Sequence, residues 1–212
     1  MKPLIAPIAL GLAFLLAACG GDSSGDGQSG QTTAAKAGPQ ERAFLSAMVP
    51  HHRSAVEMAS AAEGRLEDPQ IRRIEGAIAK AQTAEIDQMK RIHERLFGAP
   101  LAPDEGAHTQ LGLSAQEAGM DHMLGARPIK RAAEPVDRAF IDEMVPHHRG
   151  AVVMAEVVLE PSRDPELRKL AAGIIDAQES EIKTMNRVRE REFGGPVKEN
   201  KGAGGHGTGH SG

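Results

Sequence analysis

The hexapeptide Met-Val-Pro-His-His-Arg occurs twice in this chain, at residues 48–53 and again at residues 144–149. A constant offset of 96 residues relates the two copies, and it aligns residues 42–100 with residues 138–196 without a gap. Of the 59 aligned positions, 28 are identical. A repeat of this kind predicts that one small structural unit is built twice and that the two copies complete each other.

Each repeat has the pattern of two helices. Side chains of the first repeat fall three or four residues apart and so share one stripe of a helix: Phe44, Met48, His51, Ala55, Met58 and Ala59. The Asp-Pro pairs at 68–69 and 164–165 predict an N-cap followed by proline in the first turn of a second helix. We expect this helix to end near Gly98, and we expect Pro50 to disturb the first helix.

A helical hairpin alone has one apolar face and nothing to cover it. Pairing the two hairpins buries both faces, so we predict an all-α fold, a four-helix bundle made from two duplicated helical hairpins at residues 41–100 and 137–196. The inter-repeat segment, residues 101–136, is longer than a bundle needs. Within it, Ser114 and Glu117 form a capping-box pattern that predicts a short helix over residues 114–124.

The two ends of the chain differ in composition from the repeats. Residues 1–19 have a positive start, a short apolar run and the sequence Leu-Ala-Ala-Cys, which is typical of a lipoprotein signal peptide with Cys19 as the lipidated residue. Residues 20–40 form a Gly/Ser-rich stretch expected to be a flexible tether. Residues 197–212 form a Gly/His tail expected to be disordered. We therefore expect an extracytoplasmic protein, anchored by lipid to the cell envelope.

Composition excludes several classes of function. The formal net charge is −4, aromatic residues make up 2% of the chain, and there is no Trp or Tyr. Nucleic-acid binding is therefore not expected, because it needs a basic surface or aromatic stacking platforms. Neither repeat contains a glycine-rich nucleotide motif or a nucleophile elbow. We expect a protein that is not an enzyme.

The positions shared by the repeats favour imidazole and thioether groups, which bind soft and borderline metal ions. The candidate ligands are His51, His52, Met48, Met58 and Met89 in the first repeat, and His147, His148, Met144, Met154 and Met185 in the second. Successive helical residues differ by about 100°, so the two histidines of a pair cannot both point at the bundle axis. We expect one to bind on the axis and the other to reach sideways.

Polar groups on the second helix of each repeat are expected to orient these histidines. Glu85 and Glu181 lie on otherwise apolar stripes, beside Gln82 and Gln178. A carboxylate on such a stripe needs a partner, and an N–H of a metal-bound imidazole is a suitable one. The ligand roles of His93, His122, His206 and His210 stay open on sequence alone.

Ligand softness favours copper. Thioethers favour Cu(I), while imidazole also accepts Cu(II), so we expect copper with Cu(I) preferred. A di-iron oxidase would need Glu-x-x-His pairs on the bundle helices, and neither repeat contains one. Two alternatives remain: an envelope interaction or structural protein whose methionines and histidines only pack a core, and a bundle metal oxidase.

The motif Phe44-x3-Met48-x2-His51-His52, with Gln82-x2-Glu85 downstream, resembles the bacterial domain of unknown function 305, and the second repeat matches it as well. The resemblance covers both repeats. It implies a ferritin-like helical fold and extracytoplasmic copper binding through these Met and His residues. The expected partners are thus the metal ion, the membrane through the lipid, and a copper-transfer protein.

Overall fold

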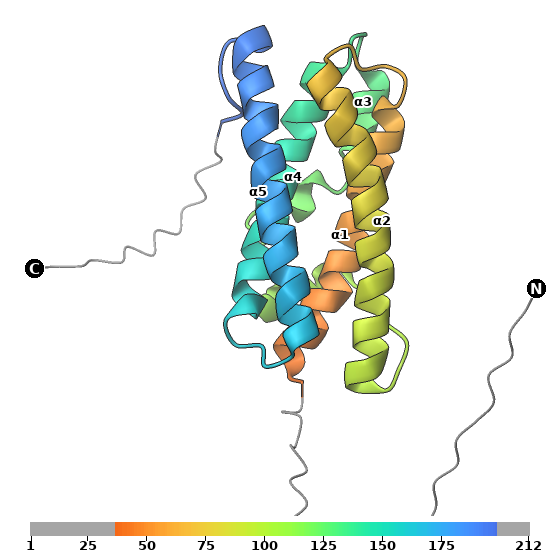
Figure 1. The fold of residues 1–212 in the computed structure, drawn as a ribbon, viewed down its shortest axis with the longest axis vertical. Helices are drawn as coiled ribbons and strands as arrows, with labels where there is room; N and C mark the ends of the chain where they lie inside the picture. Colours follow the sequence, from red (N-terminus) through yellow and green to blue (C-terminus); the bar gives the residue numbers. More distant parts are fainter. Residues whose placement is uncertain (1–36, 199–212) are drawn as a thin grey trace, which may run out of the picture. The chain divides into compact units, whose positions relative to one another are not determined.

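A computed structural model describes residues 37–198, and the described residues form helices and no strands, as expected for an all-α fold (Figure 1). The four long helices are α1 (Pro39–Ala62), α2 (Pro69–Phe97), α4 (Asp137–Leu159) and α5 (Pro165–Phe193). Between α2 and α4 the chain forms two 3-10 helices, η1 (Glu105–Leu111) and η2 (Met120–His122), and the short helix α3 (Ala126–Arg131).

The helix boundaries follow the sequence signals. The Asp68 carboxylate accepts hydrogen bonds from the backbone N–H groups of Gln70 and Ile71, and Asp164 accepts one from Leu167. Gly98 ends α2 in the left-handed region at φ 66°, which a residue without a side chain adopts at little cost. Pro50 lies inside α1 and Pro146 inside α4.

The long helices pack as two antiparallel hairpins, α1 with α2 and α4 with α5 (Figure 1). Further contacts join α1 to α4 and α2 to α5. Reciprocal ion pairs support this arrangement, because Arg95 of α2 contacts the N-cap Asp164 of α5 and Arg191 of α5 contacts the N-cap Asp68 of α2. The starts of α2 and α5 are thus each held by the end of the other helix.

The buried apolar residues of the four helices form two separate clusters. One joins the start of α1 and the end of α4, and includes Phe44 and Val158. The other joins the end of α1 and the start of α4, and includes Ala62 and Phe140. The buried polar side chains His51, His52, His147 and His148 lie at sequence positions between the two sets. We call these four side chains the imidazole layer.

The connection between the halves differs from expectation. Ser114 and Glu117 form the predicted capping-box bonds. However, residues 115–119 form turns and only Met120–His122 is helical, because Gly119 adopts φ 65° and so interrupts a right-handed helix. The helices η1 and α3 were not predicted.

Several expectations about the ends concern residues that the structure does not describe. The signal peptide, Cys19 and most of the tether fall within residues 1–36, and His206 and His210 fall within residues 199–212. Across residues 37–198, no helix has both the length and the apolar character needed to span a membrane.

Candidate metal centre

His51 of α1 and His147 of α4 contact each other in the interior. Their ring centroids are 3.7 Å apart, the planes are inclined by 32°, and neither residue is exposed. Both nitrogens of each ring are buried and make no hydrogen bond of good geometry, although the backbone of Ala118 and His147 approaches the His51 ring. Leaving a buried donor unpaired typically costs about 1–3 kcal/mol, so this pair is unfavourable for packing alone.

His52 and His148 point away from this central pair. The Nε2 atom of His52 lies 2.9 Å from a carboxylate oxygen of Glu85, and Nε2 of His148 lies 2.7 Å from Glu181. Their Nδ1 atoms are buried and unpartnered. A carboxylate that holds one imidazole nitrogen as a donor leaves the other with its lone pair, as in metal-bound histidines. The predicted difference between the two histidines of each pair and the contacts with the glutamates are therefore observed.

Burial keeps the central imidazoles neutral. Desolvation, followed by the proximity of other imidazoles, lowers the pKa of both His51 and His147 well below the usual value. Two protonated rings at this separation would also repel each other strongly. Neutral imidazoles retain the lone pairs that metal coordination requires.

Six methionine side chains belong to the two apolar clusters, three to each. Because α1 and α2 are antiparallel and His52 meets Glu85, Met48 lies one turn away at the level of Met89. Met48 and Met89 share an apolar cluster with Met154 from the other half. The equivalent cluster contains Met144, Met185 and, again from the opposite half, Met58. All six side chains are fully buried.

These donors fit a soft metal ion and do not fit a hard one. Among the described residues, no three His, Cys, Asp or Glu groups are arranged to hold a metal ion. Methionine thioethers are the donors that Cu(I) and Ag(I) prefer. The unpartnered imidazole nitrogens and buried thioethers of the four helices are thus compatible with a monovalent soft ion. The buried Oε1 atoms of Gln82 and Gln178 also lack partners.

The remaining described histidines have structural contacts. Nδ1 of His93 bonds the carbonyl oxygen of Ala99, and Arg189, its counterpart 96 residues on, donates to Gly195. His93 and Arg189 therefore have the same structural role: each binds the backbone just after its helix, α2 or α5. Nδ1 of His108 bonds the carbonyl oxygen of Leu113.

The Glu-x-x-His pattern that a di-iron oxidase needs on its bundle helices occurs once in the sequence, at residues 105–108. It lies in η1 and outside the long helices.

Two glycines that the sequence reasoning missed close the site. A Cβ atom on Gly150 of α4 would lie 2.3 Å from the backbone of both Ala118 and Gly119. A Cβ on Gly119 would lie 3.2 Å from Nε2 of His51. The connecting backbone therefore lies directly over the central imidazoles. The alignment of the repeats could have pointed to this position, because it pairs Gly150 with Ser54. The Ser54 hydroxyl donates to the Met123 carbonyl and so holds the same connecting segment against α1.

Residues 41–189 match the sequence profile of the family described as Domain of unknown function (DUF305). The chain belongs to the DUF305 family. A crystal structure of a putative secreted DUF305 protein from Streptomyces coelicolor is similar, at TM-score 0.65 and 25% identity, over 76% of this chain and 98% of that one.

Solved structures of CopM resemble this DUF305 chain as well. The Cu(I)-bound form of CopM has a TM-score of 0.58 and 29% identity, covering 73% of this chain and 98% of that chain. The Ag-bound form obtained by co-crystallization gives TM-score 0.58 and 28% identity over the same shares. Among curated sequences, the uncharacterized protein L153 of Acanthamoeba polyphaga mimivirus is 35% identical over 52 residues. That match spans 24% of this chain and about a third of the length of L153.

Proposed function

We propose that this protein binds copper outside the cytoplasm, preferentially as Cu(I), and sequesters the ion or transfers it without catalysing a reaction. The observation that carries the proposal is the set of six buried imidazole nitrogens without partners, at the contact between α1 and α4. A neutral imidazole has one lone pair, so a metal ion that accepts one lone pair from each ring would offset part of the cost of burying these groups.

The proposed ligands have separate roles. His51 and His147 bind the ion through ring nitrogens, and Met48, Met144, Met58, Met154, Met89 and Met185 supply thioether sulfur. Glu85 and Glu181 fix the Nε2 atoms of His52 and His148, so that their buried Nδ1 atoms keep the lone pair and are further donors. None of these donors is anionic, which favours a monovalent ion and reversible release.

The resemblance to CopM supports the choice of ion. CopM structures are described in Cu(I)-bound, Cu(II)-bound and Ag-bound forms. Ag(I) resembles Cu(I) in its preference for soft ligands and is not readily oxidised in air. It is therefore a suitable probe for a Cu(I) site.

The architecture and location are part of the same proposal. We infer a ferritin-like four-helix bundle that arose by duplication of one hairpin, since the His–Glu contacts, the Asp N-caps and the post-helix contacts all recur at the offset of 96 residues. Lipidation at Cys19 would tether the protein to the envelope, where a copper-transfer protein would meet it. The secreted DUF305 relative supports an extracytoplasmic location.

Competitive titration of the full-length protein against a Cu(I) chelator under reducing conditions tests this function. We expect one or two ions to bind per chain and the melting temperature to rise. Replacing both His51 and His147 by Ala should lower the Cu(I) affinity at least 100-fold, about 3 kcal/mol, while far-UV circular dichroism remains helical. His108→Gln is the matched control, because His108 lies in η1, outside the imidazole layer, and its replacement should leave the Cu(I) affinity unchanged.

The alternative outcomes are distinct. If the wild-type protein does not compete with the chelator, the His and Met residues serve packing and the protein is an interaction protein without metal. If the double variant binds as tightly as the wild type, copper binds elsewhere and the site assignment is wrong.

A further inference from the structure

His122 lies on the connecting segment, and its two ring nitrogens have different surroundings. Nδ1 is 3.2 Å from a carboxylate oxygen of Glu143 on α4, whereas Nε2 is 3.8 Å from a carboxylate oxygen of Asp121. In the neutral ring with Nδ1 donating to Glu143, Nε2 carries the lone pair; the hydrogen bond to Glu143 also raises the pKa of His122, so metal binding at Nε2 competes with a proton. The same carboxylate–imidazole pairing presents histidines to metal ions elsewhere in proteins.

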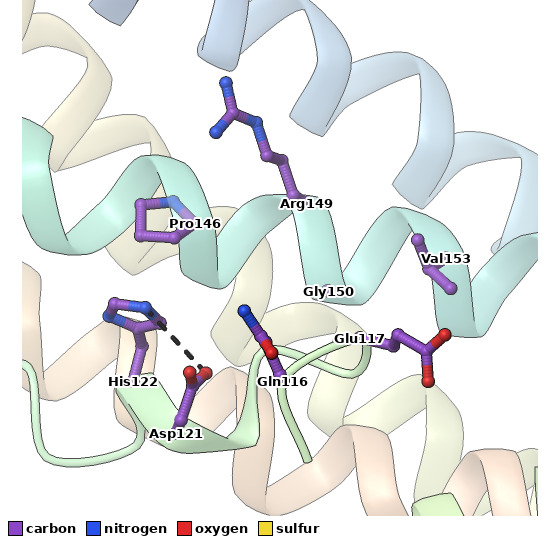
Figure 2. Close-up of a pocket in the computed structure, with 8 residues that line it drawn as sticks. All are labelled: Gln116, Glu117, Asp121, His122, Pro146, Arg149, Gly150 and Val153. Atoms are coloured by element: carbon purple, nitrogen blue, oxygen red, sulfur yellow. Dashed lines mark ion pairs between the residues drawn. The ribbon is translucent and has the colours of Figure 1, made fainter. Parts of the chain in front are cut away.

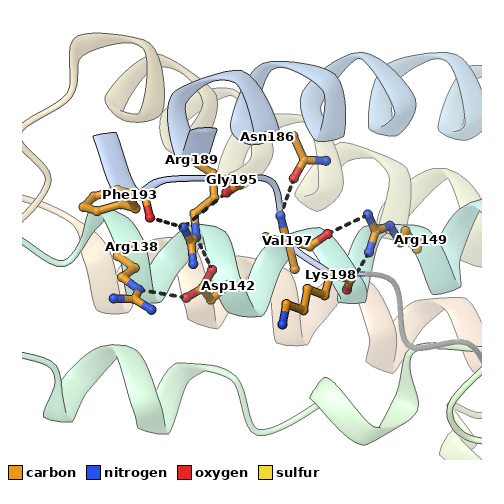
Figure 3. A network of polar contacts seen from close by, with 9 residues as sticks. All are labelled: Arg138, Asp142, Arg149, Asn186, Arg189, Phe193, Gly195, Val197 and Lys198. Atoms are coloured by element: carbon orange, nitrogen blue, oxygen red, sulfur yellow. Dashed lines mark hydrogen bonds and ion pairs between the residues drawn. The ribbon is translucent and has the colours of Figure 1, made fainter. Parts of the chain in front are cut away.

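His122 and Asp121 lie side by side at a hollow of about 230 Å³ between the connecting segment and α4 (Figure 2). Glu117 contributes a second carboxylate to the lining. The one cationic side chain there is Arg149, which donates to the carbonyl oxygens of Val197 and Lys198 in the C-terminal segment (Figure 3). The lining thus carries more carboxylate than cationic charge, which favours a cation.

We propose that His122 and Asp121 form an outer cation site, which takes a borderline divalent ion such as Cu(II) through the imidazole Nε2 and a carboxylate oxygen. Nitrogen and oxygen donors favour Cu(II), in contrast to the thioethers around the imidazole layer. Among residues 37–198, no three His, Cys, Asp or Glu groups are arranged to hold a metal ion, so this site would have two protein ligands and water would supply the rest. This inference goes beyond the proposed function and does not depend on it.

The position of the outer site relates it to the inner layer. Gly150 lines the hollow and also contacts the backbone of Ala118 and Gly119. A Cβ on Gly119 would lie 3.2 Å from Nε2 of His51, so the same stretch of main chain is next to both the hollow and the imidazole layer. With only two protein ligands, the outer site binds weakly and exchanges its ion readily.

Cu(II) titration followed by electron paramagnetic resonance tests the outer site, in the full-length chain with His206→Gln and His210→Gln so that the tail contributes no imidazole. We expect His122→Gln to remove a Cu(II) signal with nitrogen coupling and to weaken that binding at least about 10-fold, and Glu143→Gln to weaken it less. His108→Gln, in the same connecting segment, should leave the signal unchanged.

The readouts separate this site from the inner one. His122→Gln should retain Ag(I) binding, whereas the His51 and His147 double variant should retain the outer Cu(II) signal. If His122→Gln alters helical content, Asp121→Asn provides the test, because it keeps the size of the side chain and removes its charge. Cu(II) affinity that is equal in His122→Gln and His108→Gln would overturn the inference.

Discussion

At the scale of single residues, the central histidines are in an environment that disfavours their charged form. His51 and His147 are fully buried against each other, and burial together with neighbouring imidazoles lowers the pKa of both. The unfolded chain can protonate these side chains near their ordinary pKa of about 6.5, while the folded chain cannot. Stability is therefore coupled to pH through these two residues.

This coupling predicts a loss of stability in acid. Below about pH 6.5 the unfolded state binds more protons than the folded state, so the free energy of unfolding falls as the pH falls. Between pH 7.5 and pH 5.5 we expect a loss of about 2–3 kcal/mol from the two residues, measured by urea unfolding of the metal-free protein. A variant with His51→Leu and His147→Leu should lose correspondingly less, and an equal loss in both proteins would contradict the assignment.

At the scale of elements, the connecting segment is held against the helices by close backbone contact. Ala118 and Gly119 rest on Gly150 of α4, and Ser54 of α1 binds the carbonyl group of Met123. The outer contact between His122 and Glu143 fixes the same segment to α4. This segment therefore forms a wall of the central site, although it lies outside both repeats.

Gly150→Ala tests this contact. The added Cβ would overlap backbone atoms of Ala118 and Gly119, which cannot rotate away as a flexible side chain would. We expect the free energy of unfolding to fall by about 1–3 kcal/mol. The matched control is Gly173→Ala in α5, where an added Cβ would meet no atom of another element within 4 Å. There, helix propensity predicts that the free energy of unfolding rises by about 0.5–1 kcal/mol. A gain of stability at Gly150 like that at Gly173 would show that the segment does not lie there.

Sequence patterns were sufficient for the long helices and insufficient for what connects them. The Asp-Pro pairs and Gly98 mark helix ends because capping is local chemistry, and the structure confirms them. The layout of the connecting segment depends on tertiary contact with Gly150, which no local pattern encodes. Likewise, helical spacing separated the directions of His51 and His52, but only the packing of α1 on α4 brings His51 to His147.

At the scale of the whole molecule, the two halves contribute equally to one central region. Each half supplies a central histidine, a His–Glu pair and thioethers that join clusters with the other half. A single hairpin has only half of these donors, and without the other hairpin they would face solvent. We therefore infer that metal binding is a property of the paired hairpins.

X-ray absorption at the copper edge, on the full-length protein loaded with one equivalent of Cu(I), tests this claim most directly. We predict a first shell that contains both imidazole nitrogen and thioether sulfur, and we predict that the nitrogen contribution disappears when His51 and His147 are both replaced by Ala. A first shell without imidazole nitrogen in the wild-type protein, or an unchanged spectrum in the double variant, would contradict a copper site shared by the two halves.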